Sequence, residues 1–214
     1  MGVTGSHANS VAPLLISTEQ GYLKSTFCKS LLPPALQRYY MDKVDLTSQG
    51  HIERRLAEMG LLNLDEFDKY APTKMPLLKN LMQMASLSLC KAYQKNYRSL
   101  PRIASFIGTS NRKDLLTDPT GSRRFICVLV EYPIDCEGID YAQLYAQLKA
   151  EILAGEHYWF TKEEETELQQ SNMTFYRQGP VEYLSAIEED KSGSYAWGKS
   201  GEFGTNTDSS GDRT

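Results

Sequence analysis

The 214-residue sequence has little of what marks several classes of protein. Its four cysteines are widely spaced and form no C-x-x-C pair, which favours reduced thiols in a reducing, cytoplasmic compartment over a disulfide scaffold or a zinc site. The three histidines are scattered without metal-binding spacing. No run reaches the ~18 apolar residues of a membrane span, and the start lacks the basic-then-apolar pattern of a signal peptide, so no membrane partner is expected. The net charge of −4 gives no global basic field for nucleic acid, although a local patch stays possible.

What is present is an alternation of short apolar runs with segments of helical spacing. This alternation predicts an α/β fold with a mostly parallel central sheet. Ligands of such sheets bind at the carboxyl ends of the strands, so the polar residues that follow each strand are the first candidates for a site. The expected strands are 14–16, 41–46, 61–64, 103–108 and 125–130, and the expected helices are 24–32, 35–40, 47–59 and 73–90.

The first strand leads into a phosphate-binding candidate. A polar loop, 17–23, follows the strand, and Lys24, Ser25 and Thr26 open the next helix. Strand, loop, Lys-Ser/Thr and helix is the order that a phosphate-binding P-loop needs. Lys24 would reach the β- and γ-phosphates of a nucleotide, and the Ser25 hydroxyl would bind Mg²⁺.

The same loop departs from the G-x-x-x-x-G-K-[ST] pattern. The pattern needs a glycine directly before the lysine, where this chain has Leu23, and a second glycine five residues earlier, which is also absent. Only Gly21 supplies a residue that tolerates any backbone conformation. The alternative is an ordinary strand-to-helix turn with a surface lysine. Nucleotide-binding candidates are Gly21, Lys24, Ser25 and Thr26.

Two further strands end in residues suited to nucleotide hydrolysis. Asp65 would hold Mg²⁺, and Glu66 would orient or deprotonate the attacking water. Asn111 could hydrogen-bond the γ-phosphate or that water. The alternatives are an acidic pair that caps the next turn and a turn-forming asparagine. Lys24, Asp65 and Asn111 each follow a different strand, so we expect them to meet at one edge of the sheet.

Basic residues suggest two more roles. Arg123 and Arg124 are candidate arginine fingers that would supply charge to a phosphoryl transition state, or else a solvated pair beside a strand. The segment 91–102 interleaves basic and aromatic residues and could track a nucleic-acid backbone, or else form a charged surface hairpin. Its candidate residues are Lys91, Tyr93, Lys95 and Arg98, with Tyr97 and Arg102 beside them.

The C-terminal part has its own pattern. Helices are expected at 141–154 and 161–170, the second with a capping box of Thr161 and Glu164, and a short aromatic strand is expected at 158–160. From 193 on the chain is rich in Gly, Ser, Thr and Asp and lacks periodicity. We therefore expect a flexible lead-in at 1–11, a core at 12–135, a small helical extension at 136–190 and a disordered tail at 191–214.

Two stretches, FIGTSN at 106–111 and DPTGSRRF at 118–125, resemble the virulence-associated protein E family, whose signature is close to FIGTTN…L.DPTGNRRFW. The likeness covers roughly residues 12–175. Within the family, the sequence also resembles versions from Bacteroides-type bacteria and their mobile elements. It implies a P-loop NTPase fold related to AAA+ and superfamily 3 helicases, a three-layer sandwich that uses ATP and Mg²⁺. By this resemblance Lys24 and Ser25 belong to Walker A, Asp65 and Glu66 to Walker B, and Asn111 to sensor 1.

The resemblance also bears on partners and function. It implies a homo-oligomeric ring in which Arg123 or Arg124 reaches a neighbouring subunit's nucleotide. It also implies the motor of a helicase or primase-helicase, with a hairpin at 91–102 that contacts single-stranded DNA. Two alternatives stay open. One is a degenerate domain that folds and binds without hydrolysing ATP, and the other is a small-molecule P-loop kinase.

Overall fold

The fold was analysed in a computed structural model that describes residues 9–90, 97–118 and 122–177. The chain divides into two compact units, Met1–Arg177 and Gln178–Thr214, and every described residue belongs to the first. Among the described residues, no helix is both long and apolar enough to cross a membrane.

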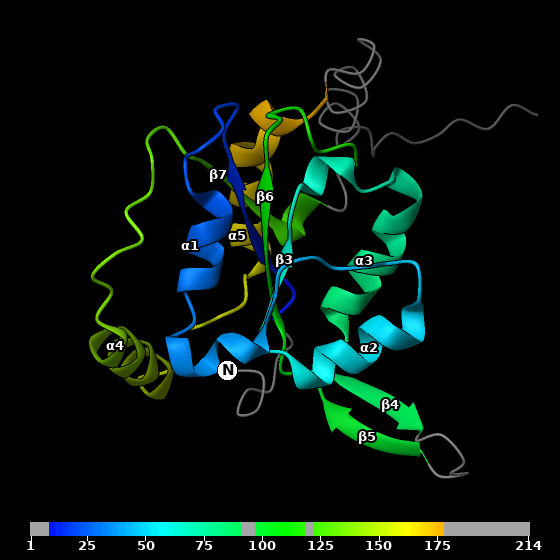
Figure 1. The fold of residues 1–214 in the computed structure, drawn as a ribbon. Coiled ribbons are helices and arrows are strands. Elements are labelled where there is room, and N and C mark those ends of the chain that lie inside the picture. The colour runs from blue at the N-terminus through cyan, green and yellow to red at the C-terminus, as the bar shows by residue number, and fades with distance from the viewer. Residues whose placement is uncertain (1–8, 91–96, 119–121, 178–214) are drawn as a thin grey trace, which may run out of the picture. The chain divides into compact units, whose positions relative to one another are not determined.

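The first unit is built on a five-stranded sheet in the order β2-β3-β6-β1-β7 (Figure 1). All four strand pairs are parallel, which confirms the α/β fold and the parallel sheet expected from the alternation of elements. The strands are β1 (Ala12–Ile16), β2 (Tyr40–Met41), β3 (Leu61–Leu64), β6 (Ser105–Ser110) and β7 (Phe125–Leu129).

Helices cover both faces of the sheet, because alternate residues of each strand point to opposite sides. On one face lies α1 (Lys24–Ser30), where Cys28 packs with Leu15 and Ile107. On the other face lie α2 (Gln49–Glu58) and α3 (Met75–Gln83), which bury the larger cluster around Leu14, Leu62 and Phe106. Figure 1 shows this layering with the sheet between the helices.

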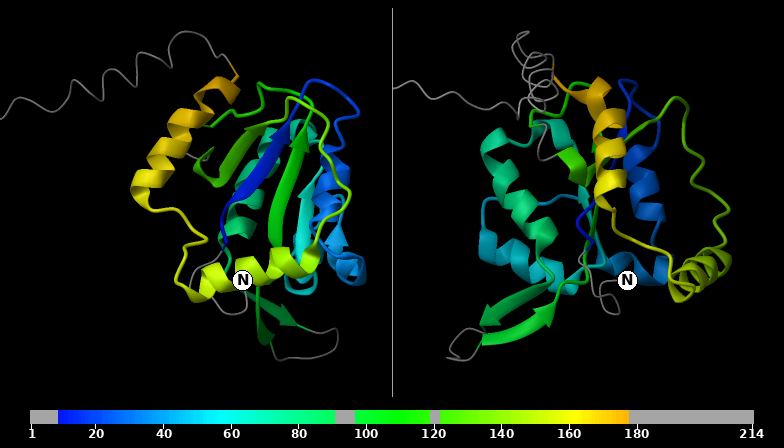
Figure 2. Two further views of the ribbon diagram at one scale, coloured as in Figure 1. Left: turned by 90° about the vertical axis from the view of Figure 1, so that its left-hand side faces the viewer. Right: turned by 180° about the vertical axis from the view of Figure 1, so that it is seen from behind.

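Two further helices follow the sheet. The first, α4 (Tyr141–Leu153), is held to the end of α1 by hydroxyls, since Tyr141 donates to Ser30 O at 2.7 Å and Tyr145 donates to Leu31 O at 2.8 Å. The second, α5 (Lys162–Ser171), begins with the expected capping box of Thr161 and Glu164 and flanks the β7 edge of the sheet (Figure 2).

The edge strand β7 is protected by a buried side chain. Asn172, in the 3₁₀ helix Asn172–Phe175, donates through Nδ2 to Phe125 O at 2.7 Å and accepts through Oδ1 from Cys127 N at 3.4 Å. An unpaired edge is a template for association with other chains. Asn172 therefore takes the place that another strand's backbone would occupy.

The predicted helix at 73–90 was too long. It ends at Gln83, and its last part is β4 (Ser86–Cys90), which pairs antiparallel with β5 (Tyr97–Pro101). The sequence Ser-Leu-Ser-Leu-Cys alternates with period two, which fits a strand better than a helix. Met84 leaves the helix with extended backbone, and the side chain of Arg102 holds its carbonyl oxygen.

Two other predicted strands were wrong in part. Only Tyr40–Met41 pairs in the sheet, and a single antiparallel bridge joins Lys43 to Leu64, because the chain turns at Asp45, whose carboxylate accepts from Thr47 N at 2.8 Å. The aromatic segment 158–160 bends instead of forming a strand, and its rings contact one another. The helix predicted at 35–40 is a 3₁₀ helix, Pro34–Tyr39, and Tyr40 begins β2.

Candidate functional site at the carboxyl edge of the sheet

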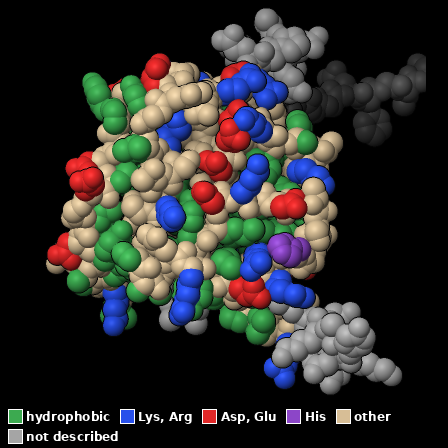
Figure 3. Space-filling model, viewed as in Figure 1, with side chains coloured by type: hydrophobic (Ala, Val, Ile, Leu, Met, Phe, Trp, Pro, Cys, Tyr) green, Lys and Arg blue, Asp and Glu red, His purple; other side chains and the backbone are tan. Residues whose placement is uncertain are grey.

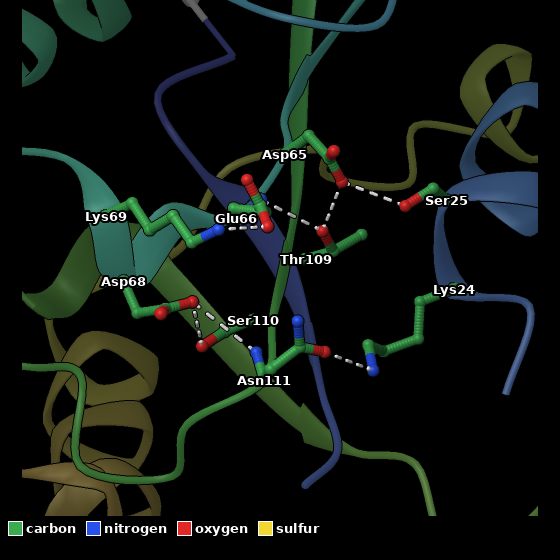
Figure 4. A network of polar contacts seen from close by, with 9 residues as sticks. All are labelled: Lys24, Ser25, Asp65, Glu66, Asp68, Lys69, Thr109, Ser110 and Asn111. Carbon is green, nitrogen blue, oxygen red and sulfur yellow. Dashed lines mark hydrogen bonds and ion pairs between the residues drawn. The ribbon is translucent and has the colours of Figure 1, made fainter. Parts of the chain in front are cut away.

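Three neighbouring strands bring the predicted site residues to one edge. Leu64 of β3 lies beside Gly108 of β6, and Ile16 of β1 lies beside Ser110 of β6. The residues that follow these strands therefore emerge side by side, as Figure 4 shows for Asp65, Asn111 and the lysine at the start of α1.

Lys24 is the cation at the centre of this edge. Only 8% of the residue is exposed, and its Nζ donates to Asn111 Oδ1 at 3.0 Å and to the carbonyl oxygens of Ser17 and Glu19 at 3.3 Å each. Burial lowers the pKa of this ammonium below its ordinary value, and the negative charges of Asp65 and Asp68 oppose that shift. All three acceptors are neutral, so the charge of Lys24 is available to an anionic ligand.

A hydroxyl and a carboxylate meet next to Lys24. Ser25 Oγ donates to Asp65 Oδ1 at 2.8 Å, and Thr109 Oγ1 donates to the same oxygen at 2.7 Å (Figure 4). The Thr109 hydroxyl also accepts from Glu66 N at 3.2 Å. Thr109, in β6, thus fixes both acidic residues of the 65–66 pair.

The second acidic residue of the pair is turned toward a neighbouring cation. Glu66 has a left-handed backbone with φ 52°, and its carboxylate forms an ion pair with Lys69. The next carboxylate along the chain, Asp68, contacts β6, since its Oδ1 accepts from Ser110 Oγ at 3.0 Å and from Asn111 N at 3.4 Å.

The loop that leads to Lys24 has two left-handed positions, Gly21 with φ 84° and Leu23 with φ 59°. The second is where the P-loop pattern has glycine, so the backbone takes a conformation that suits glycine while the sequence supplies leucine. Of the other predicted residues, Thr26 is exposed on α1.

The predicted arginine fingers lie at the amino ends of the strands, opposite the carboxyl edge that carries Lys24. Arg123 and Arg124 belong to the 3₁₀ helix Ser122–Arg124, directly before β7, and Phe125 lies beside Ala12 at the start of β1. Arg123 pairs with Glu165 of α5 at 3.4 Å. Burial lowers the pKa of the Arg124 guanidinium, and the charge of Arg123 adds to the shift.

The predicted nucleic-acid segment falls on the β4–β5 hairpin, which projects from the amino edge of the sheet (Figures 1 and 2). Arg98 is exposed on β5, whereas Lys91, Tyr93 and Lys95 lie outside the described residues.

Acidic and basic side chains are interspersed over the face seen in Figure 3, which therefore carries no field of a single sign.

Arg102 was wrongly grouped with this segment. It is only 4% exposed and donates to the carbonyl oxygens of Met84, Ala104 and Asn9. Burial lowers its pKa to about 10. Its guanidinium binds these backbone carbonyl groups and thereby joins the hairpin to β6, so its role is structural.

Sequence reasoning missed Thr109 and Asp68. Both had a signal. Thr109 lies two residues before Asn111, so in an extended strand the two share a face and an edge. Asp68 lies three residues after Asp65, about one turn of 3₁₀ helix further on. The free thiols among the described residues are Cys28, Cys127 and Cys136.

Comparison with known proteins gives one family. The family model of the virulence-associated protein E-like domain matches residues 7–177. No curated protein matches the chain. Solved structures of the C-terminal region of NrS-1 are similar to it. One shares 18% identity over 81% of this chain and 36% of its own length with a TM-score of 0.44, and another shares 16% over 86% and 43% with a TM-score of 0.46. The chain thus spans less than half the length of these structures. By the family match, which covers most of its length, the chain belongs to the virulence-associated protein E-like domain family.

Proposed function

We propose that this domain binds ATP with Mg²⁺ and hydrolyses it, as the motor of a DNA-acting protein in the replication of a mobile element. The observation that carries the proposal is the meeting of Lys24, Ser25 and Asp65 at the carboxyl edge of a parallel sheet, with Ser25 Oγ 2.8 Å from Asp65 Oδ1. A lysine, a hydroxyl and a carboxylate in this setting are the parts of a P-loop NTPase site.

The donor set fits the metal. Mg²⁺ prefers hard oxygen ligands and is commonly held by one or two protein groups together with substrate phosphates. Ser25 Oγ and Asp65 Oδ1 are such groups, and they lie on the same side of Lys24. Bound Mg²⁺ would neutralise charge on the phosphates. Lys24 would exchange its carbonyl and amide acceptors for phosphate oxygens.

The remaining residues have complementary roles in this proposal. Glu66 would release Lys69 and turn to the attacking water as its base or orienting group. Asn111, freed from Lys24, would hydrogen-bond the γ-phosphate or the same water. Thr109 holds the backbone N–H of Glu66, so the Glu66 side chain would turn on a fixed backbone.

The position of the arginines supports action between subunits. Arg124 precedes β7 at the amino edge, and β7 spans the sheet from Phe125 to Leu129, which is about 13 Å at ~3.3 Å per residue. An arginine side chain does not cross that distance and also reach beyond the opposite edge. We therefore place the finger in trans, within a homo-oligomeric ring, and assign single-stranded DNA to the exposed hairpin that carries Arg98.

Binding is tested by the thermal stability of the purified protein with and without Mg·ATP. At 100 times its Kd a ligand adds about 2.7 kcal/mol, which is about 5–10 °C in Tm for a chain of this size. Lys24→Ala should abolish the shift. Lys29→Ala, an exposed lysine on the same helix, should keep it and is the matched control. A wild-type protein without any shift at millimolar Mg·ATP contradicts the proposal.

Hydrolysis is tested by phosphate release. Glu66→Gln should retain nucleotide and lose turnover, since the amide cannot act as a base. Equal loss of binding and turnover would show that Glu66 supports the fold or the metal instead.

Assembly is tested by mixing two inactive variants. Arg123→Ala/Arg124→Ala supplies an intact Lys24, and Lys24→Ala supplies intact arginines, so the mixture should regain activity. Activity per subunit should also rise with protein concentration, because a finger contributes on the order of 10³–10⁵ in kcat. Activity independent of concentration, with no gain in a mixture shown to co-assemble, rules out a finger in trans.

A binding module without turnover is the second candidate, and Leu23 is the observation that favours it. The leucine occupies a left-handed position of the loop, where the P-loop pattern has glycine, so it adds a side chain to the segment that would hold the phosphates. If the wild-type protein binds Mg·ATP without hydrolysing it and Leu23→Gly restores turnover, this candidate is correct for the natural sequence.

A further inference from the structure

Asp68 has no role in the function proposed above, yet it contacts the strand that carries the site. It is half-buried, and one of its oxygens, Oδ1, accepts from both Ser110 Oγ at 3.0 Å and Asn111 N at 3.4 Å. Ser110 Oγ also accepts from Arg112 N at 3.0 Å, and Arg112 O, 2.9 Å away, is a second acceptor for its single proton. The carboxylate therefore holds the start of the loop that leaves β6.

The fold fixes Asp68 independently of these bonds. It lies in the 3₁₀ helix Phe67–Lys69, and the preceding Phe67 is buried in the core with its ring 4.9 Å from that of Phe125. The buried Phe67 ring anchors the short helix that carries Asp68 to the core. Asp68 is thus a fixed point, and Asn111 is the group that it can orient.

We propose that Asp68 is a positioning residue that sets the backbone of Asn111 and thereby aims the Asn111 amide, which holds the Lys24 ammonium in the free protein and would face the γ-phosphate or the attacking water once nucleotide is bound. The proposal rests on the proposed nucleotide site for its functional meaning. The chain of contacts runs from Asp68 Oδ1 to Asn111 N and from Asn111 Oδ1 to Lys24 Nζ, the last at 3.0 Å (Figure 4). Asn111 links the two without any other described side chain between them.

The first experiment compares Asp68→Asn with Asp68→Ala. Asparagine keeps an oxygen that can accept from Ser110 and Asn111, whereas alanine removes it. Positioning partners of site groups typically contribute 10–100-fold, so we expect Asp68→Ala to lower kcat by about that factor with the KM for ATP changed less than about threefold. Asp68→Asn should recover most of the loss. Equal loss in both variants would overturn the hydrogen-bond role.

The second experiment uses non-additivity. If Asp68 acts through Asn111, the double variant Asp68→Ala/Asn111→Ala has the same kcat as Asn111→Ala alone. Additive losses would overturn the inference. Asp114→Ala is the matched control, because this exposed carboxylate follows the same strand and pairs with Arg112 at 2.7 Å without contacting Asn111.

The third measurement needs no nucleotide and separates this inference from the proposed function. Amide hydrogen exchange of Asn111, followed by NMR in the free protein, should be at least ~10-fold faster in Asp68→Ala than in wild type, with Asp68→Asn and Asp114→Ala unchanged. An unchanged rate in Asp68→Ala overturns the inference whatever the activity. A wild-type protein without ATP turnover would overturn the hydrolysis proposal, and the exchange rates would still decide the role of Asp68.

Discussion

Leu23 occupies a backbone conformation that its own β-carbon disfavours. Its φ is 59°, and it is the N-cap residue of α1, directly before Lys24. Its N–H and C=O direct the loop into the helix, and Phe27 N donates to Leu23 O at 2.8 Å, so the conformation is held by the first helical hydrogen bond. Replacing Leu23 by glycine should relieve the strain without changing the path of the chain.

The magnitude follows from two opposing effects. The left-handed conformation costs a residue with a β-carbon about 1–2 kcal/mol. Glycine avoids that cost but makes the unfolded chain more flexible, which lowers the free energy of unfolding by about 0.4–1 kcal/mol. Leu23 is 45% exposed, so glycine also loses some apolar contact. Comparing Leu23→Gly with Leu23→Ala removes this last effect, and we expect glycine to be more stable than alanine by about 1 kcal/mol, or ~2–4 °C in Tm.

The assay is urea and thermal unfolding of both variants, with a matched pair in a helix. Arg54 is exposed within α2, where glycine is less stable than alanine by about 1 kcal/mol. The glycine–alanine difference should therefore have opposite signs at the two positions. If alanine equals or exceeds glycine at Leu23 while the Arg54 pair behaves normally, the loop is not strained and the reasoning is refuted.

Three further predictions concern buried polar groups. Wild type should gain stability relative to Lys24→Met as pH rises from 7 toward 10.5, because burial lowers the pKa of Lys24 and the folded protein loses this proton before the unfolded chain does; urea unfolding at pH 7 and pH 10 measures the difference. Arg102→Met should cost about 3 kcal/mol by leaving buried carbonyl groups unpaired, whereas exposed Arg98→Met should stay within about 0.5 kcal/mol in the same assay. Asn172→Leu should cost about 2 kcal/mol and increase self-association through the uncovered β7 edge, seen by light scattering. Unchanged unfolding midpoints would contradict each assignment.

Sequence reasoning located the polar residues of the candidate site because strand ends are strong signals in an α/β chain. An apolar run followed by Asp65, and another followed by Asn111, required no tertiary information beyond the rule that parallel strands end at a common edge. The register confirms that expectation, since β3, β6 and β1 are neighbours. Which strands are adjacent does not follow from composition or periodicity.

The misjudged elements have local causes. The segment 73–90 contains leucine and methionine at helical spacing, yet its last residues also alternate with period two, and tertiary pairing with β5 decided the outcome. Arg102 was grouped by charge with exposed neighbours. Its burial depends on carbonyl groups at Asn9, Met84 and Ala104, and their convergence becomes visible only in three dimensions.

The FIGTSN stretch shows why one short segment can carry a family resemblance. Phe106 lies in the core, and Gly108 lies where a β-carbon would be 2.6 Å from the side chain of Leu14 and 3.1 Å from the carbonyl oxygen of Leu64. A β-carbon there would force the Leu14 side chain aside and crowd the carbonyl oxygen of Leu64 in β3. β1 leads to the loop before Lys24 and β3 leads to the Asp65–Glu66 pair, so a residue larger than glycine would disturb the packing beside the contacts of Thr109 with Asp65 and of Asn111 with Lys24. In β6, Phe106 and Gly108 serve packing, whereas Thr109 and the following Asn111 make the polar contacts of the site. A substitution in the apolar part of this strand would therefore also disturb the site.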